Sequence, residues 1–357
     1  MAFSKKARHG VGSAPRAGFL GFECLRELCL LSGGIAAVMI FINGVNQPNQ
    51  DNLTTSMKAG AAAEAQPDQP IYRICPQPDQ KLVWLKRGDS TLVQVSLESG
   101  DVVDRIPIFS SSVSSAAHSL DGRVHACATV PGGITIVRDG ITLVDEPIPA
   151  LAFPVVTVDV SGDGRSVAAG AENREVRIWS LSDARPTSRS LTLKSPAVHV
   201  LWSEQGDRLL IGCGDGTLCL FNPEGQEIWK VDGTFARISS LAWTLDGQRI
   251  AVGMQGGDVA VLDPADGQLV WRSRHDSVQI SAVAFAPDNQ RLVVGGFDRH
   301  VDILSASNGE RLQRMSGHYD MVRALHFLPD GERVVSGSLD GTLRVWSSSE
   351  GRELQRF

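Results

Sequence analysis

The chain has 357 residues, of which 42% are hydrophobic and 21% are charged, and it contains 36 glycines. This composition is typical of a globular protein with many turns and excludes a wholly disordered chain. The formal net charge of -6 at pH 7 disfavours binding to nucleic acid, because contact with phosphates needs clustered positive charge. We therefore expect no nucleic acid among its partners.

The first 70 residues divide into three segments of different composition. Residues 1–27 form a basic tail, residues 28–45 contain no charged residue, and residues 46–70 contain few large apolar side chains. As a helix, the uncharged run would be about 27 Å long, which is close to the thickness of the bilayer hydrocarbon. The pattern predicts a single transmembrane helix over 28–45, followed by a flexible linker over 46–70.

The charges on either side of the apolar run predict its orientation. Five lysines and arginines precede it, whereas Lys58 is the sole basic residue in the 27 positions that follow. The positive-inside rule then places the N-terminus in the cytoplasm and the rest of the chain on the far side, periplasmic or lumenal. Two alternatives remain: a cleaved signal peptide, and a hydrophobic helix that never enters a bilayer, which would leave the protein in the cytoplasm.

Residues 71–357 repeat a pattern about every 42 residues. Basic residues lie at steps of 41 to 43, each just after a turn signal: Lys81, Arg123, Arg165, Arg208, Arg249, Arg291 and Arg333. An apolar column keeps the same spacing: Val95, Val137, Trp179, Phe221, Leu262, Leu304 and Trp346. Such a constant period predicts a repeat fold, in which each unit carries its own core positions.

One repeat unit holds four short strands and three tight turns. In the last unit we expect strands over 322–328, 333–337, 342–346 and 352–357, with Pro-Asp-Gly and Asp-Gly turns between them. A lone sheet of this size would leave both of its faces exposed to water, so the units must stack. Radial stacking also protects the edges of the sheets. The sequence predicts an all-β, seven-bladed β-propeller of four-stranded antiparallel blades that start near Ile71, Val113, Val155, Ala197, Ile238, Ile280 and Val322.

The seventh unit resembles the WD40 repeat family, and the resemblance extends over residues 71–357. It is carried by Gly317-His318, by residues 327–331 and 336–341, and by Val345-Trp346. In that family a His, a Ser or Thr, an Asp and a Trp form a buried hydrogen-bonded network within one blade. The resemblance implies such a structural tetrad for His318, Ser336 (or Ser338), Asp340 and Trp346.

The other six units depart from the WD40 pattern. None has Gly-His before its first strand, and among them only Trp179 fills the Trp column. We therefore expect these blades to rely on apolar packing. WD40 rings are usually locked by a strand borrowed from the opposite terminus, whereas each unit here owns four strands, so we predict ring closure by packing alone.

Blades four and five are also similar to quinoprotein-type propellers. The segments Gly225–Trp229 and Gly267–Trp271 match the Gly-x-x-x-Trp units of those proteins, in which the Trp docks between adjacent blades. The resemblance implies a packing device that also occurs in non-enzymatic envelope scaffolds. A propeller that binds a redox cofactor and an envelope assembly scaffold remain alternative functions.

The sequence contains no recognisable catalytic or metal-binding motif. The six cysteines show no Cys-x-x-Cys or Cys/His ligand spacing, and the eight histidines are scattered over different positions of the repeat. We therefore expect no enzymatic activity, no metal and no cofactor. Cys213 and Cys219 flank a turn, and the strand register decides whether they share a face and could pair, or stay as buried thiols.

WD40-like proteins generally bind peptides or whole domains on the face formed by the turns between second and third strands. The loops that break the repeat pattern on this face supply our candidate partner-binding residues: Arg174, Phe297, Arg299 and Tyr319. Phe297 could instead cap a contact between blades. The repeated basic column lies on the opposite face, where acidic neighbours largely cancel its charge. The sequence as a whole predicts a membrane-tethered scaffold for protein–protein interaction.

Overall fold

The computed structural model describes residues 70–76, 81–87, 91–107, 113–119, 123–129, 133–139, 141–147, 154–181 and 186–357. The predicted basic tail, the predicted membrane helix and the predicted linker, apart from Pro70, lie outside these residues. Within the described part of the chain, no helix is long and apolar enough to span a bilayer.

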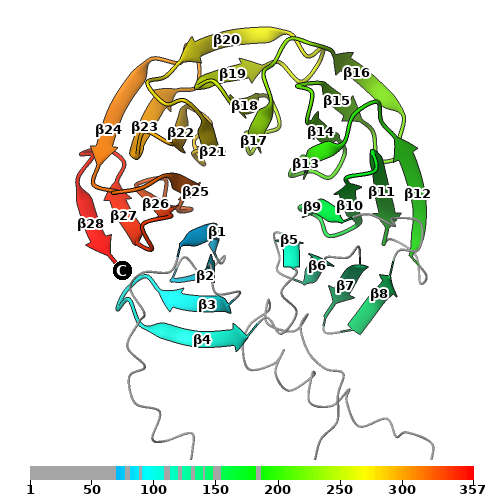
Figure 1. The fold of residues 1–357 in the computed structure, drawn as a ribbon, viewed down its shortest axis with the longest axis horizontal. Helices are drawn as coiled ribbons and strands as arrows, with labels where there is room; N and C mark the ends of the chain where they lie inside the picture. The colour runs from blue at the N-terminus through cyan, green and yellow to red at the C-terminus, as the bar shows by residue number, and fades with distance from the viewer. Residues whose placement is uncertain are drawn as a thin grey trace, which may run out of the picture.

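The described strands form seven antiparallel sheets of four strands, arranged as a ring (Figure 1). Blades 1 to 4 consist of β1 (Ile71–Pro76), β2 (Leu82–Arg87), β3 (Thr91–Ser96) and β4 (Val102–Pro107); β5 (Val113–His118), β6 (Val124–Thr129), β7 (Gly133–Arg138) and β8 (Ile141–Pro147); β9 (Val155–Val160), β10 (Ser166–Ala171), β11 (Glu175–Ser180) and β12 (Thr187–Thr192); and β13 (Ala197–Trp202), β14 (Leu209–Cys213), β15 (Leu218–Phe221) and β16 (Glu227–Val231).

Blades 5 to 7 follow in the same order, each running from the innermost strand to the outermost. They consist of β17 (Ile238–Trp243), β18 (Ile250–Met254), β19 (Asp258–Leu262) and β20 (Leu269–Arg274); β21 (Ile280–Phe285), β22 (Arg291–Gly296), β23 (His300–Ser305) and β24 (Arg311–Ser316); and β25 (Val322–Phe327), β26 (Arg333–Ser338), β27 (Leu343–Ser347) and β28 (Glu353–Arg356). The seven innermost strands begin at the residues where the period predicted the blades to start, which confirms the repeat boundaries.

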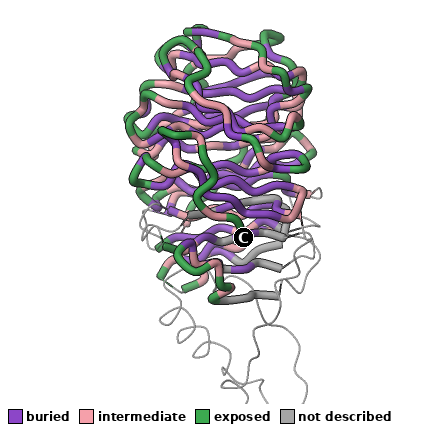
Figure 2. The backbone as a smooth tube through the Cα atoms, turned by 90° about the vertical axis from the view of Figure 1, so that its left-hand side faces the viewer, coloured by how far each residue is buried: buried purple, intermediate pink, exposed green. Residues whose placement is uncertain are grey.

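The second and third strands of the blades are more buried than the innermost and outermost strands, as in blades 4 and 5. Second and third strands such as β26 and β27 are buried on both faces, whereas outermost strands such as β12 and β28 are largely exposed (Figure 2). The buried strands consist of runs of Val, Ile, Leu, Ala and Gly, because both of their faces meet a neighbouring blade. The outermost strands carry charged and hydroxyl side chains, as edge strands in soluble proteins usually do.

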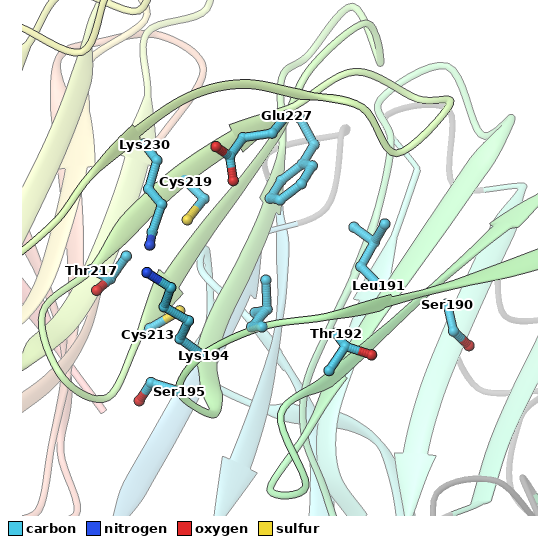
Figure 3. A pocket seen from close by; sticks show the side chains of 12 residues that line it. Ser190, Leu191, Thr192, Lys194, Ser195, Cys213, Thr217, Cys219, Glu227 and Lys230 are labelled. Atoms are coloured by element: carbon cyan, nitrogen blue, oxygen red, sulfur yellow. The ribbon is translucent and has the colours of Figure 1, made fainter.

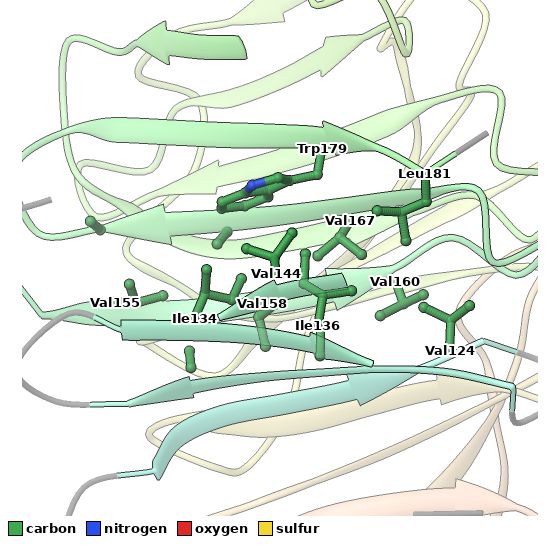
Figure 4. Packing of buried hydrophobic residues seen from close by; sticks show 14 residues of the cluster. Val124, Ile134, Ile136, Val144, Val155, Val158, Val160, Val167, Trp179 and Leu181 are labelled. Carbon is green, nitrogen blue, oxygen red and sulfur yellow. The ribbon is translucent and has the colours of Figure 1, made fainter. Parts of the chain in front are cut away.

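Apolar side chains from adjacent blades interdigitate to form the core. Between blades 2 and 3, Ile134 and Ile136 of β7 pack against Val155 and Val158 of β9, with Trp179 in the same cluster (Figure 4). Each fully buried side chain of this size contributes about 1.5–3 kcal/mol to the free energy of folding. The seams between blades therefore hold much of the stability of the ring.

Hydroxyl side chains connect the innermost strands of successive blades, which do not pair with each other. The backbone N–H of Val158 donates to Ser115 Oγ at 3.1 Å, and that of Val200 donates to Thr157 Oγ1 at 3.3 Å. The acceptor is a side chain of the preceding blade at the same position of the repeat. These bonds satisfy backbone donors that would otherwise be buried without a partner.

The seam between blades 7 and 1, where the two ends of the ring meet, is closed by packing. All four strands of blade 7 come from residues 322–356, and Ile71 and Ile74 of β1 are buried against Ala324, Val335 and other residues of blade 7. Within the described residues no strand is exchanged across this seam. The residues before Pro70, on which the prediction of closure by packing alone depends, lie outside the described residues.

A second device, which we call the latch column, links each outer strand to the following blade. It consists of one residue per blade that faces the same position of the third strand and donates a hydrogen bond to a backbone carbonyl in the next blade's third-to-fourth strand turn. Its members in the described residues are Arg189 to Glu224 (2.6 Å), Trp229 to Pro264 (2.8 Å), Trp271 to Ala306 (2.8 Å), Gln313 to Glu350 (3.3 Å) and Gln355 to Glu98 (3.5 Å).

The two tryptophans of the latch column pack on glycines of the next blade. A Cβ on Gly267 would lie 3.0 Å from the Trp229 ring, and one on Gly309 would lie 2.6 Å from the Trp271 ring. Both glycines also have positive φ angles, 72° and 74°, which other residues rarely adopt. The quinoprotein-like pattern of blades 4 and 5 is therefore a packing contact between blades, as the resemblance implied.

Candidate protein-binding face

The structure brings His318, Ser336, Asp340 and Trp346 together in blade 7 as one hydrogen-bonded chain. The Trp346 Nε1–H donates to Ser336 Oγ at 2.7 Å, and Ser336 Oγ lies 2.7 Å from His318 Nε2. His318 Nδ1 lies 2.9 Å from Asp340 Oδ2. One proton arrangement satisfies every bond: Ser336 donates to Nε2, and Nδ1–H donates to the carboxylate.

Burial and hydrogen bonding set the protonation of this network. Burial lowers the pKa of His318, although the neighbouring Asp340 opposes the change, so the imidazole stays neutral at pH 7. Burial alone would raise the pKa of Asp340, but hydrogen bonds from the Thr342 hydroxyl, from the backbone N–H groups of Tyr319 and Thr342, and from His318 lower it to about 2. The Asp340 carboxylate is therefore the charged group of the network, and its oxygen atoms accept the hydrogen bonds of these donors.

The network ties the connection before β25 to the turn between β26 and β27. The His318 side chain is fully buried and that of Asp340 is 6% exposed, so neither could bind a partner directly. Their position fixes the loop that carries the exposed Tyr319, whose backbone N–H donates to Asp340 Oδ2 at 2.9 Å. The tetrad is therefore a support for the surface and not part of the surface itself.

The loops of the propeller form two faces, which follow from the order of strands in each blade. We call the upper face the one that carries the second-to-third strand turns and the connections between blades. The lower face carries the first-to-second and third-to-fourth strand turns. All four candidate partner-binding residues lie on the upper face: Arg174 and Arg299 in second-to-third strand turns, Phe297 in the same turn as Arg299, and Tyr319 in the connection between β24 and β25.

The two aromatic candidates are exposed. Phe297 is 49% exposed and Tyr319 is 72% exposed, so both residues are accessible to a partner. The guanidinium groups of Arg344 and Arg356 lie 5.8 Å and 5.9 Å from the centre of the Tyr319 ring. Contacts of this kind hold an exposed ring in place. An aromatic side chain that is fixed yet open to solvent is typical of a binding hot spot.

The two arginine candidates occupy strained positions. Arg174 and Arg299 have φ angles of 70° and 69°, in the left-handed region that costs most residues about 1–2 kcal/mol. At the same place in the turn, blades 4, 5 and 7 have Gly216, Gly257 and Gly341, with φ angles of 86°, 84° and 81°. Blades 3 and 6 therefore keep an arginine where the backbone favours glycine, and strain of this kind is common at functional sites.

The repeated basic column of the lower face is neutralised by carboxylates. Each member of the repeated column pairs with an acidic residue: Lys81 with Glu98 (3.2 Å), Arg123 with Asp139 (2.7 Å), Arg165 with Asp163 (3.9 Å), Arg208 with Asp207 (3.5 Å), Arg249 with Asp263 (3.9 Å), Arg291 with Asp288 (2.7 Å) and Arg333 with Asp330 (2.6 Å). This is the cancellation of charge that the sequence predicted for that face.

The upper face differs from the lower face in this respect. It carries five exposed basic residues that have no carboxylate within 4 Å among the described residues: Arg174, Lys194, Arg237, Arg274 and Arg299. Only Arg174 and Arg299 were expected there from the sequence. The other three become apparent only in the structure, which shows that no carboxylate among the described residues lies beside them.

Comparison with known proteins supports the repeat assignment. A family model described as WD domain, G-beta repeat matches residues 151–180, 267–303 and 309–347, and a model of the anaphase-promoting complex subunit 4 WD40 domain matches residues 200–272. A crystal structure of a computationally designed protein, Ika8, superposes with a TM-score of 0.64 over 81% of this chain and 87% of that chain. Its sequence is 21% identical, so this likeness concerns the fold alone.

Curated relatives match only part of the chain. The chicken (Gallus gallus) WD repeat-containing protein 91 is 27% identical over 168 residues, which is 46% of this chain and 22% of that protein. The orangutan (Pongo abelii) protein of the same name is 30% identical over 121 residues, or 32% of this chain and 17% of that protein. The chain thus matches less than a quarter of these relatives. Taken with the seven four-stranded blades and the His-Ser-Asp-Trp network, the comparisons show a seven-bladed β-propeller that contains WD40 repeats.

Proposed function

We propose that this protein is a membrane-tethered scaffold that binds protein partners on the upper face of its propeller and performs no catalysis of its own. The observation that carries the proposal is the contrast between the two faces of the described blades. Exposed aromatic side chains and strained arginines without a carboxylate partner gather on the upper face, whereas the repeated basic column of the lower face is paired with carboxylates. WD40 propellers generally bind protein partners.

The proposed contact residues are Phe297 and Tyr319, flanked by Arg299 and Arg174. Partners captured by proximity labelling around the full-length protein in cells should be lost from a Phe297→Ala/Tyr319→Ala double variant. A matched control is Ile228→Ala, because Ile228 is also an exposed apolar side chain, at 48%, but lies on an outer strand. If the double variant retained every partner, the assignment of the upper face would be wrong.

The membrane tether rests on the sequence of residues 28–45 and on the charge difference across them. We propose a single-pass anchor with the N-terminus in the cytoplasm and the propeller on the far side. Carbonate extraction and protease accessibility of a C-terminally tagged protein test both points. Carbonate-resistant protein whose tag is cut from the far side would support the proposal, whereas carbonate-soluble, protected protein would assign the propeller to the cytoplasm.

A further inference from the structure

The seam between blades 3 and 4 contains a cavity of about 380 Å³. The next two seams hold the indole rings of Trp229 and Trp271, but the latch column of blade 3 has Arg189, which is not among the residues that line the cavity. The walls are instead Leu191 and Leu193 of blade 3 and Phe221 of blade 4. At the latch position itself, Gly225 of blade 4 is covered by Leu191 and Arg189, and Gly225 is not among the residues that line the cavity.

The floor of this cavity is apolar and uncharged. Cys213 and Cys219 are buried and free, and burial raises the pKa of both thiols to about 12, so they carry no charge at neutral pH. Cys219 pairs in register with Ile211, two residues before Cys213, which places both sulfur atoms on the same side of the sheet (Figure 3). Neither thiol repels an anionic group.

The mouth of the cavity carries two ammonium groups. Figure 3 shows the Nζ atoms of Lys194 and Lys230 next to each other, to one side of the two sulfur atoms, with the Thr217 side chain nearby. Lys230 pairs with Asp232 at 2.7 Å, and Asp232 also accepts from Thr217. In the described part of the chain, Asp232 is the one carboxylate within 4 Å of either ammonium group, and Glu227 lines the cavity at a greater distance from both. A second carboxylate between them would be stabilised by both.

The cavity opens onto the proposed protein-binding face. Lys194 lies in the connection between β12 and β13, and Thr217 in the turn between β14 and β15, both of which belong to the upper face. The backbone N–H of Leu193 donates to the carbonyl of Arg174 at 2.9 Å, so the cavity adjoins one of the two strained arginines. A volume of this size holds one or two side chains and is small for a large ligand.

We propose that the cavity receives an acidic side chain, Asp or Glu, from an extended segment of the protein partner. The carboxylate lies between the ammonium groups of Lys194 and Lys230, and an adjacent apolar part of the segment contacts Leu191 and Phe221. This inference rests on the proposed function, because it specifies the chemistry of the partner that the upper face binds.

The test is to pan a phage library of random short peptides on the immobilised full-length protein, purified in mild detergent. The wild type should select peptides that carry an Asp or Glu next to an apolar residue. Replacing that acidic residue by its amide should weaken the binding of the best peptide about tenfold or more, as should Lys194→Gln/Lys230→Gln, because a partly buried charge pair is lost. Cys219→Leu should also weaken binding, because its larger side chain fills the floor.

A charge-matched control separates the cavity from general electrostatic attraction. Lys81→Gln/Arg165→Gln removes the same charge from the lower face, where both residues are exposed and paired, and should change binding less than about twofold. Melting temperatures of all variants show whether each is folded. An equal loss in this control would overturn the proposal.

The remaining outcomes separate the two proposals. Selected peptides that lack acidic residues, or that bind the lysine variant normally and are lost with Tyr319→Ala, would overturn the acidic subsite while supporting the upper face as the protein-binding face. Selection of no peptide would also overturn the subsite, and the proximity labelling with the Phe297 and Tyr319 variants would still decide the scaffold function independently.

Discussion

Replacing the two strained arginines by glycine should make the protein more stable and a poorer binder. At φ angles of 70° and 69°, Arg174 and Arg299 are each destabilised by about 1–2 kcal/mol, a cost that glycine does not have. Glycine instead loses about 0.5–1 kcal/mol through the greater freedom of its unfolded chain. The net gain is roughly 0.5–1 kcal/mol per site, and the two sites should add because they lie in different blades and share no partner.

The double variant Arg174→Gly/Arg299→Gly should therefore unfold at a higher denaturant concentration, by an amount equivalent to about 1–2 kcal/mol, and should capture less partner. Arg174→Ala/Arg299→Ala is the matched control, because it removes both guanidinium groups and keeps a Cβ at the strained positions. The alanine variant should lose binding without the gain in stability. A glycine variant less stable than the wild type would show that the arginines make compensating contacts, and unchanged binding would remove them from the proposed site.

Four further predictions concern the propeller itself. Asp340→Ala should destabilise the protein by about 1–3 kcal/mol in chemical denaturation, because buried donors lose their acceptor; Asp340→Asn, which keeps one acceptor, should cost less. Trp271→Ala should cost about 3–5 kcal/mol, whereas an unchanged melting temperature would refute its role in the seam. Because the pKa of His318 is lowered in the fold, only the unfolded state gains a proton as pH falls below about 6.5; stability should therefore decline there, and less steeply in His318→Asn. With pKa values raised to about 12, Cys213 and Cys219 should resist alkylation at pH 7 in the folded protein, and rapid labelling would contradict their burial.

The repeat period predicted the fold in detail because it reports a physical constraint that acts on every blade. A strand buried on both faces must present large apolar side chains at fixed intervals, and each first strand must follow a connection of fixed length. This is why the spacing alone identifies Ile71, Val155 and Val322 as the starts of innermost strands. The tetrad was recognisable for a related reason, since its four residue types occur together only in the seventh unit.

Other parts of the site depend on register and on pairing in space, which a sequence does not display. Cys213 and Cys219 share a face only because the hairpin is in one register, and as diagonal neighbours they are typically roughly 7–8 Å apart between Cα atoms, too far for easy disulfide formation. The cavity beside them is invisible in the sequence because it depends on how side chains of blades 3 and 4 pack against each other in space. The latch column was recognised only at its two tryptophans, because Arg, Gln and Trp share no chemistry except an N–H donor.

Departures from the repeat therefore fall into two kinds, and the distinction is physical. Gln313 and Gln355 stand where blades 4 and 5 have the latch tryptophans, and both still donate a hydrogen bond to the turn of the next blade. These blades therefore keep the hydrogen bond across the seam without the indole ring. Arg174 and Arg299 replace glycine at a cost in backbone strain, and no carboxylate among the described residues offsets that cost. These two arginines destabilise the fold and gain no ion pair within it. Contact with a partner would account for them, which is the reason to look for the partner on the upper face.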